Sequence, residues 1–510
     1  MRRFRFLCDV SERNGVRLVV GLITGWMSGR MFVPPALESK TPIADAEAIK
    51  WEVRFVRHFV REMKDHPAII GWDLGNECNC MAWKDIGPYE SWMWMNTIAS
   101  AIRMEDCTRP VVSGMHSCST VQSEKWNLYQ QGELMDILTT HPYPLWTPHC
   151  NTEPFDTIRN CCHAACETVY YADMTGKPAF AEEAGSMGPG ITSEERAAAS
   201  MRAALFSCWA NGIPGYVWWC GFDQDRLTHA PYDWTAIERE LGLFTAEGKA
   251  KPTALALRDF ATFINGLPFE RLPPRRIDAV VVVSEKEDAW KSAQGAWLLA
   301  KRAGFDISYA RAEDAKLPDS EFYILPSGRG YETYSRAAFR RVMEKAREGA
   351  TVLLTLGNGA VLSDLEATAG VRTESHYFRP SRHDVRCGEE NFAVSDSHTR
   401  NVAATTSSVL VKDDSGMSFL TVNGYGKGRV LFCNAAIETA APLSAEGVYR
   451  LAAREAGVKR AVTVDNPSIG FTEHQLNDSV LLVVAINYEP SEVVGKLTVK
   501  GRVGKVYRGS

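Results

Sequence analysis

Short apolar runs alternate with helical stretches through residues 1–265. Each run ends in a loop rich in Gly, Pro, His or Trp, and another helical stretch follows. This alternation is typical of βα units, whose parallel strands carry their functional residues at the carboxyl ends. Strands are predicted at residues 16–23, 68–74, 110–113, 135–139, 179–181 and 216–219.

Between the first two predicted strands, apolar residues recur at helical spacing. Their i, i+4, i+7, i+11, i+14 pattern predicts one apolar stripe on a helix. The residues of this stripe are Ile49, Val53, Val56, Val60 and Met63. Pro67 follows closely and predicts the end of the helix.

Six βα units are two fewer than a closed (β/α)8 barrel needs. The residues before position 16 leave room for one helix, over 4–13. An open sheet is the alternative, but it would leave two parallel edges unpaired. We therefore expect an α/β fold in which a TIM barrel, over residues 1–268, lacks its first two βα units and is gapped between the strands at 16–23 and 216–219.

The order of predicted strands and helices changes beyond residue 268. Strands are predicted at 277–283, 322–325 and 351–356, and helices end at Gly304 and Gly349. This order predicts a small doubly wound α/β domain, extended by a β-rich stretch and a closing helix, over residues 275–460. Residues 461–510 predict strands of a small, incomplete β-sandwich.

Composition and charge exclude several classes of protein. The 45% of hydrophobic and 23% of charged residues are typical of a globular chain. A net charge of −5 without a basic run argues against a nucleic acid or an anionic membrane as partner. The 13 cysteines lack the spacing of a disulfide scaffold, which favours a reducing cytoplasm, although a signal peptide would go unseen if residues preceded Met1.

Two of the predicted strands end in carboxylates. One ends in Asn76 and Glu77, in the sequence IGWDLGNE, and the other in Glu182 and Glu183, in KPAFAEEAG. Glu77 and Glu183 are 106 positions apart, which corresponds to three βα units of roughly 35 residues, so they can face each other across a barrel mouth. Glycoside hydrolysis requires such a pair: one carboxyl protonates the leaving oxygen and the other attacks the anomeric carbon.

On these motifs, residues 16–250 resemble the retaining glycoside hydrolases of clan A, especially family 5. The resemblance implies that Glu77 is the acid/base and Glu183 the nucleophile. It departs from the family where Ala184 replaces the usual aromatic residue, and Glu182 leaves the choice of nucleophile open. The further matches are the strand Arg109-Pro110-Val111-Val112-Ser113-Gly114, the ending His141-Pro142-Tyr143 and the pair Trp218-Trp219.

Other strand ends supply the remaining candidates. The hydroxyl of Tyr143 would hold and ionise the nucleophile. Because consecutive strand residues face opposite ways, one of Trp218 and Trp219 would form a platform for a sugar and the other would lie in the core. By the same rule, one of Glu182 and Glu183 would point into the barrel mouth and the other away. The candidate substrate-binding residues are Asn76, His116, His141, Tyr143, Trp218, Trp219 and Trp26.

One cluster has the residue types of a metal site. It contains Cys150, Cys161, Cys162, His163 and Cys166. Some family 42 β-galactosidases carry a cysteine-bound zinc near the barrel, but this cluster lacks a paired C-x2-C knuckle. Buried thiols are therefore expected, with a structural zinc as the alternative. Cleavage by paired carboxylates needs no cofactor.

The second half of the chain resembles the class I amidotransferase-like domain and the small sandwich of family 42 β-galactosidases. Residues 275–375 contain no cysteine for an amidotransferase nucleophile, so this domain is expected to be non-catalytic. The resemblance implies a homo-oligomer, a trimer or dimer, and an exo-acting retaining β-glycosidase on short β-mannosides, β-galactosides or β-glucosides. An endo-β-1,4-mannanase or glucanase, and a non-catalytic carbohydrate-binding or scaffold protein, remain alternatives.

Overall fold

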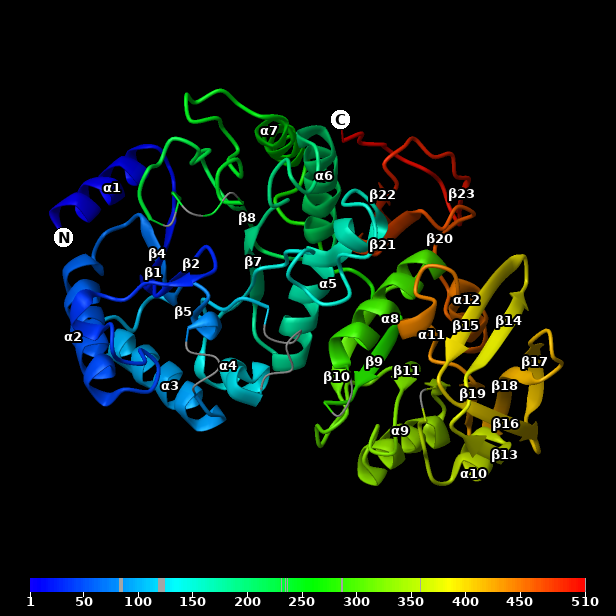
Figure 1. Cartoon of the computed structure of the whole chain (residues 1–510). Coiled ribbons are helices and arrows are strands. Elements are labelled where there is room, and N and C mark those ends of the chain that lie inside the picture. The colour runs from blue at the N-terminus through cyan, green and yellow to red at the C-terminus, as the bar shows by residue number, and fades with distance from the viewer. Residues whose placement is uncertain are drawn as a thin grey trace. The chain divides into compact units, whose positions relative to one another are not determined.

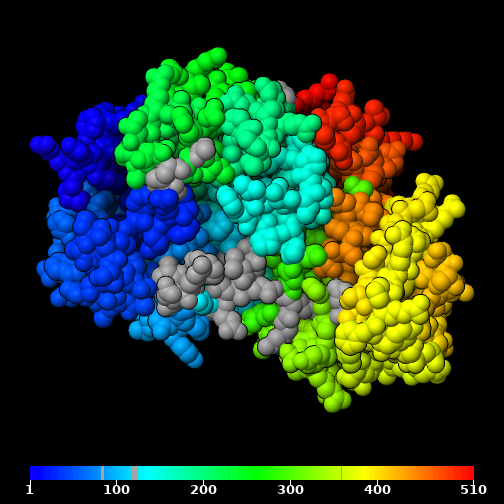
Figure 2. All heavy atoms as spheres, in the orientation of Figure 1, coloured from blue at the N-terminus to red at the C-terminus, as the bar shows by residue number. Residues whose placement is uncertain are grey.

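The computed structural model describes residues 1–81, 86–117, 124–230, 232–233, 235, 237–285, 288–357 and 359–509. The chain divides into two compact units. The first unit comprises Met1–Phe155, His163–Cys208 and Ile213–Ala261, and the second comprises Asp156–Cys162, Trp209–Gly212 and Thr262–Ser510. The first is coloured mainly from blue to green and the second mainly from green to red (Figure 1, Figure 2). The domain bounds expected at 268 and 460 stay a prediction.

Six parallel strands form the centre of the first unit (Figure 1). They pair as two three-stranded sheets, and a parallel bridge between Val112 and Ile137 joins the two. In order, the strands are β1 (Leu18–Ile23), β4 (Ile69–Gly75), β5 (Val111–Val112), β6 (Leu138–Thr140), β7 (Ala179–Ala184) and β8 (Tyr216–Trp218). The predicted mixed α/β fold is confirmed. Among the described residues no ladder joins β8 to β1, and the lack of two barrel units stays a prediction.

Helices alternate with these strands. They are α1 (Arg2–Arg13), α2 (Ala46–Met63), α3 (Pro88–Glu105), α4 (Leu128–Leu134), α5 (Ile158–Thr175), α6 (Glu194–Ala210) and α7 (Pro252–Asn265). The first strand begins two residues later than predicted, because the amide of Val16 bonds to the carbonyl of Ser11 at the end of α1 (2.8 Å). None of the helices in the described residues has the length and apolar character of a membrane span.

The helix α2 illustrates how the predicted stripe is used. Its N-terminus is capped by Asp45, whose side chain accepts hydrogen bonds from the amides of Glu47 and Ala48. Val56, Val60 and Met63 are buried as predicted, whereas Ile49 and Val53 are only half-buried. Instead, Glu52 is buried at that end of the helix and accepts a hydrogen bond from the indole of Trp94 on α3 (2.9 Å). A polar contact therefore replaces part of the apolar stripe.

A seven-stranded sheet forms the core of the second unit. Its strand order is β10-β9-β11-β12-β19-β18-β17, parallel from β10 to β19 and antiparallel beyond. The strands are β9 (Ala279–Val283), β10 (Ile307–Arg311), β11 (Phe322–Gly328), β12 (Thr351–Leu356), β17 (Ser408–Lys412), β18 (Ser418–Tyr425) and β19 (Gly428–Cys433). Its helices are α8 (Ala289–Ala303), α9 (Arg336–Glu348), α10 (Leu365–Ala369), α11 (Ile437–Ala440) and α12 (Glu446–Glu455). The parallel strands with interspersed helices agree with the doubly wound pattern of the sequence.

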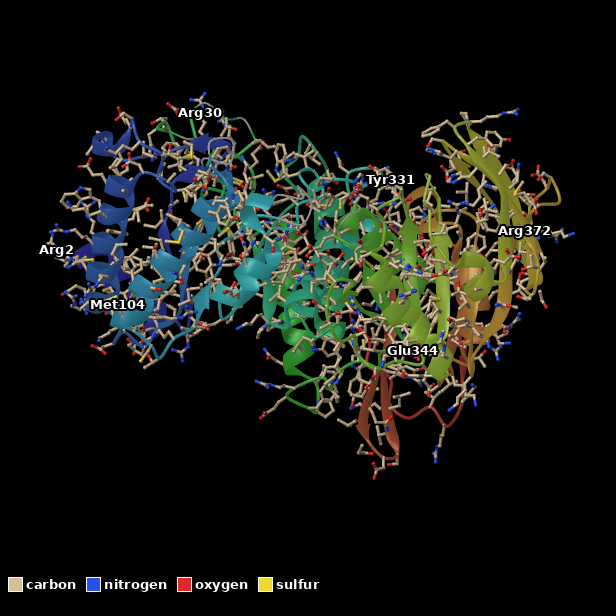
Figure 3. The ribbon with its side chains drawn as sticks, turned by 90° about the horizontal axis from the view of Figure 1, so that it is seen from below. Arg2, Arg30, Met104, Tyr331, Glu344 and Arg372 are labelled. Carbon is tan, nitrogen blue, oxygen red and sulfur yellow. The ribbon has the colours of Figure 1, made fainter. Side chains whose placement is uncertain are left out.

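Four antiparallel pairs complete the second unit. They are β13 (Val371–Tyr377) with β16 (Thr399–Ala404), β14 (Ser381–Cys387) with β15 (Glu390–Asp396), β20 (Val462–Val464) with β23 (Leu497–Val499), and β21 (Ile469–Asn477) with β22 (Val480–Asn487). The last two pairs lie in the predicted sandwich segment, and their assembly as a sandwich stays a prediction. Charged side chains such as Arg2, Glu344 and Arg372 are exposed on the two units (Figure 3).

Candidate active site

Glu77 lies directly after β4, where this strand approaches β1. Gly75 permits the approach, since a Cβ there would collide with the carbonyl oxygen of Ile23. Glu77 adopts a left-handed backbone conformation (φ 47°), and the next amide, of Cys78, bonds to the carbonyl of Gly114 (3.0 Å). Such a backbone is uncommon for a residue other than glycine and is often found at functional sites.

The carboxylate of Glu77 lies against two imidazoles. Its Oε1 is 3.0 Å from Nδ1 of His116 and 3.0 Å from Nδ1 of His141. Burial opposes ionisation of Glu77, but the charges of both imidazoles and the hydrogen bond of His141 outweigh it and hold the pKa of Glu77 well below its usual range. Burial likewise opposes the charge on His141, yet Glu183, Glu182 and Glu77 raise the pKa of His141 well above its usual value. Glu77 and His141 therefore rest as an ion pair.

Glu183, on β7, lies on the other side of His141. Its Oε1 accepts a hydrogen bond from the hydroxyl of Tyr143 (2.8 Å), and its Oε2 lies 3.4 Å from Nδ1 of His141. Burial raises the pKa of Glu183 to about 7, against the opposing effects of His141 and Tyr143. Burial and the neighbouring Glu183 also raise the pKa of Tyr143 well above its usual value, so its hydroxyl keeps its proton and donates it.

The two predicted carboxylates lie close together. The same nitrogen, Nδ1 of His141, is 3.0 Å from Oε1 of Glu77 and 3.4 Å from Oε2 of Glu183. These two oxygens are therefore at most about 6.4 Å apart, the sum of the two distances. The limit admits the roughly 5–5.5 Å carboxyl separation of retaining glycosidases.

Glu182 and Glu183 do not point in opposite directions, contrary to the expectation from strand alternation. Oε2 of Glu182 lies 3.6 Å from Nε2 of His141, whose other ring nitrogen faces Glu183. The ladder between β7 and β8 is irregular between Ala181 and Ala184, which breaks the strict alternation. Both carboxylates consequently face the same imidazole.

Hydrogen bonds hold the imidazoles and the Asn-Glu pair in place. The side chain of Asn79 accepts from the amide of His116 (2.8 Å) and donates to its carbonyl (3.2 Å), which ties the segment after Glu77 to the segment after β5. The hydroxyl of Ser117 donates to the carbonyl of His141 (3.1 Å). Asn76 donates through its side chain to the carbonyl of Trp26 (3.1 Å), in the hairpin of β2 (Trp26–Met27) and β3 (Arg30–Met31).

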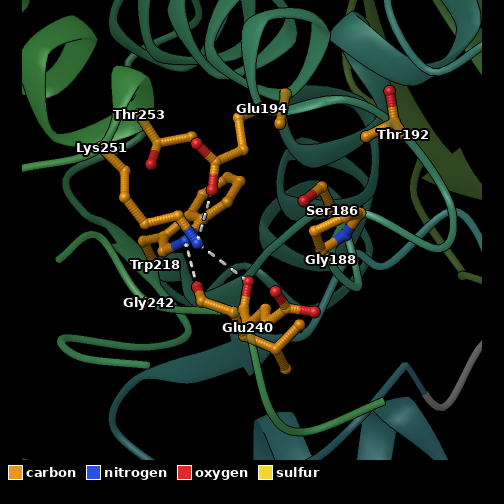
Figure 4. Close-up of a pocket in the computed structure, with 12 residues that line it drawn as sticks. Ser186, Gly188, Thr192, Glu194, Trp218, Glu240, Gly242, Lys251 and Thr253 are labelled. Atoms are coloured by element: carbon orange, nitrogen blue, oxygen red, sulfur yellow. Dashed lines mark hydrogen bonds and ion pairs between the residues drawn. The ribbon is translucent and has the colours of Figure 1, made fainter. Parts of the chain in front are cut away.

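The adjacent tryptophans at the end of β8 have different surroundings. Trp219 packs with Tyr143 in a small cluster, and its indole donates to Oε2 of Glu238 (3.1 Å). Trp218 instead donates to the carbonyl of Leu241 (3.0 Å) and lines a cavity of about 20 Å³ with Lys251 (Figure 4). Trp219 therefore lies on the side of the catalytic candidates and Trp218 does not.

Two acidic residues near the site were not predicted. Glu238 is 7% exposed, and burial raises its pKa against the opposing hydrogen bond of Trp219. Asp73, on β4, is also buried, and burial together with the charge of Glu182 raises its pKa well above its usual value. Asp73 was recognisable in the sequence as an acidic residue within the apolar run of β4, because a carboxylate is seldom buried in a strand without a partner. The loop that carries Glu238 has no such local signal.

The cysteine cluster lies apart from these residues in the sequence. Cys150, Cys161, Cys162 and Cys166 are buried. Sγ of Cys150 lies 3.7 Å from Nε2 of His163, which also bonds to Glu167 (2.9 Å). The structural zinc at these cysteines stays a prediction.

Comparisons with solved structures agree on one type of fold. The exo-β-1,4-mannosidase Op5Man5 from Opitutaceae bacterium strain TAV5 aligns over 89% of this chain and 84% of its own, with a TM-score of 0.73 and 19% identity. A catalytic mutant of Gan42B, a GH42 β-galactosidase from G. stearothermophilus, aligns over 100% and 88%, with a TM-score of 0.71 and 11% identity. A variant of GH5_18 from Streptomyces cattleya, in complex with Manb1-4GlcNAc, aligns over 61% and 79%, with a TM-score of 0.54 and 17% identity.

These similarities define the class of the fold. No protein-family model matches the chain, and no curated protein matches it. The fold is similar to that of the GH5 and GH42 glycoside hydrolases, as the motifs predicted. Both kinds of enzyme named from the sequence, family 5 and family 42, occur among the similar structures.

Proposed function

We propose that this chain is a retaining β-glycoside hydrolase in which Glu77 is the acid/base and Glu183 the nucleophile. The observation that carries the proposal is the placement of both carboxylates around Nδ1 of His141, at the carboxyl ends of β4 and β7. Carboxyl groups of inverting enzymes stand roughly 6.5–9.5 Å apart to leave room for a water molecule, so the short separation favours double displacement.

The first step transfers the sugar to the protein. The carboxylate of Glu183 attacks the anomeric carbon while Glu77 takes a proton from the imidazolium of His141 and passes it to the departing glycosidic oxygen, and a glycosyl ester forms on Glu183. Nδ1 of His141, 3.0 Å from Oε1 of Glu77, holds a proton within transfer distance of this acid. The hydroxyl of Tyr143 favours the ionised nucleophile.

The second step restores the carboxylates. Glu77, now ionised, takes a proton from water as the water oxygen attacks the anomeric carbon. The ester bond to Glu183 breaks, and the proton passes from Glu77 back to His141. The sugar leaves with its original anomeric configuration. Trp219 would support the sugar through its ring, and the carboxylate of Glu238 beside it would accept hydrogen bonds from sugar hydroxyls.

We infer exo-action on short β-glycosides, with β-mannosides as the first candidates. Op5Man5, which shares the fold over most of both chains, is an exo-β-1,4-mannosidase, and Gan42B is a β-galactosidase. The second half of the chain aligns as well, which supports the proposal that the chain forms a homo-oligomer as the family 42 resemblance implies.

Aryl β-mannoside, β-galactoside and β-glucoside substrates test the proposal. We expect turnover of at least one of them, and NMR of the first product should show the β-anomer. An α-anomer as first product would refute retention. Early loss of viscosity of a long β-mannan would indicate an endo-enzyme, and sugar binding without any hydrolysis would indicate a binding protein.

A further inference from the structure

We propose that Glu77, His116 and His141 form a binding site for a divalent ion of the zinc class, and that this ion and the substrate exclude each other. Binding of the ion follows from the geometry of these side chains and of the carboxylates beside them, and it does not require the proposed function. Its effect on turnover rests on the proposed function.

The three ligand atoms converge on one point. Oε1 of Glu77 lies 3.0 Å from Nδ1 of His116 and 3.0 Å from Nδ1 of His141. All three atoms lie within 4.8 Å of one another, and no other group of three or more such ligands in the described residues is as closely spaced. Zinc binds histidine nitrogen at about 2.0–2.1 Å and carboxylate oxygen at about 2.0–2.2 Å, so small side-chain movements and the release of the proton on Nδ1 of His141 are enough to surround an ion.

The ligands stand on neighbouring segments that are already connected. Glu77 follows β4, His116 follows β5 and His141 follows β6. The two hydrogen bonds of Asn79 to the backbone of His116, and the bond from Ser117 to the carbonyl of His141, hold these segments together. An ion would therefore meet a site that is largely formed before it binds.

The carboxylate of Glu182, behind His141, is a second and independent indication of a metal site. His141 faces Glu77 through Nδ1, and its opposite nitrogen, Nε2, faces Oε2 of Glu182 at 3.6 Å. Histidines that bind metals through one nitrogen usually present the other to a carboxylate, which orients the ring. Glu182 stands in that position.

The residue types select the ion. Two imidazoles and one carboxylate suit zinc, nickel or copper, whereas magnesium and calcium prefer oxygen ligands alone. Oε2 of Glu183 lies 3.4 Å from Nδ1 of His141 and can complete the coordination. An ion bound to Oε1 of Glu77 lowers the proton affinity of this carboxylate, which then cannot protonate the leaving oxygen, and an ion that also contacts Glu183 blocks the nucleophile.

Calorimetry with zinc chloride and absorption spectra with cobalt(II) measure binding without any assay of activity. We expect one ion per chain at this site, with tetrahedral cobalt bands that disappear on addition of EDTA. His116→Gln should weaken binding at least tenfold, and Glu182→Gln should weaken it roughly 10–100-fold. Cys150→Ser is the matched control, because Cys150 and His163 are another metal-capable pair (3.7 Å), and it should leave the ion affinity of the site unchanged.

Two results would overturn the proposal: unchanged ion affinity in His116→Gln, or a cobalt–thiolate charge-transfer band that Cys150→Ser abolishes together with the binding. Inhibition kinetics then separate this proposal from the proposed function. With an active substrate in hand, zinc should raise KM and leave kcat unchanged, and magnesium should do neither. If no glycoside is hydrolysed, the proposed function fails, but calorimetry still tests ion binding independently.

Discussion

Replacing Glu52 with Gln should remove a pH dependence of stability that this buried carboxyl creates in the first unit. Glu52 is 7% exposed, and its Oε2 accepts a hydrogen bond from Trp94 (2.9 Å). Glutamine has a similar shape and keeps an oxygen for this hydrogen bond. The substitution therefore removes the titration of the side chain with little change in packing between α2 and α3.

The magnitude follows from the pKa of Glu52. Burial raises this pKa from 4.5 to about 7, against the opposing hydrogen bond of Trp94. Because the folded state binds the proton more tightly than the unfolded state, the free energy of unfolding falls as the pH rises from 4.5 to about 7. At about 1.4 kcal/mol per pKa unit, the loss is roughly 3 kcal/mol. Below pH 4.5 both states are protonated and the loss disappears.

Urea unfolding followed by circular dichroism, repeated from acid to alkaline pH, measures this effect. Glu52→Gln should match the wild type in acid and exceed its stability by roughly 3 kcal/mol above neutral pH. Glu47→Gln is the control, since Glu47 lies on the same helix, is exposed and pairs with Lys40 (2.9 Å). Equal pH profiles for the wild type and Glu52→Gln would refute the reasoning, as would an equal gain in Glu47→Gln.

Three further predictions concern the proposed reaction. Glu183→Ala should lower kcat by roughly 10³-fold or more, and Glu182→Ala should lower it less. If steady-state kinetics show the larger loss in Glu182→Ala, the nucleophile is Glu182. Tyr143→Phe should move the acid limb of kcat/KM up by about one pH unit, because Glu183 loses a donor that favours its ionised form, and an unmoved limb would contradict the role of this hydrogen bond. Glu238→Gln should raise KM roughly tenfold with little change in kcat, whereas an unchanged KM in initial-rate measurements would place Glu238 outside the sugar site.

Local patterns were sufficient to predict the strands and the proximity of four candidate residues. An apolar run followed by a polar loop identified the ends of β4, β6 and β7, and parallel strands present those ends on the same edge. Glu77, His141, Tyr143 and Glu183 are consequently found together, as the order of the motifs predicted.

Other contacts between distant segments were not indicated by the sequence. Glu182 faces His141 because the ladder between β7 and β8 is irregular, and no residue pattern in either strand indicates such an irregularity. Glu238 meets Trp219 through the folding of the loop after β8. The separation of Trp218 from Trp219 could be foreseen from strand alternation, but which of them faces the site could not.

The contact between Asn76 and the β2–β3 hairpin is made to the backbone carbonyl of Trp26 rather than to its side chain. A carbonyl is present whatever residue occupies position 26, so substitution there preserves the support of Asn76. Insertion or deletion in the hairpin, in contrast, would carry the carbonyl away from Asn76. Among homologous chains we therefore expect side chains to vary widely at position 26 while the length of the hairpin stays constant, because the side chain there can change without disturbing the carboxylate next to Asn76.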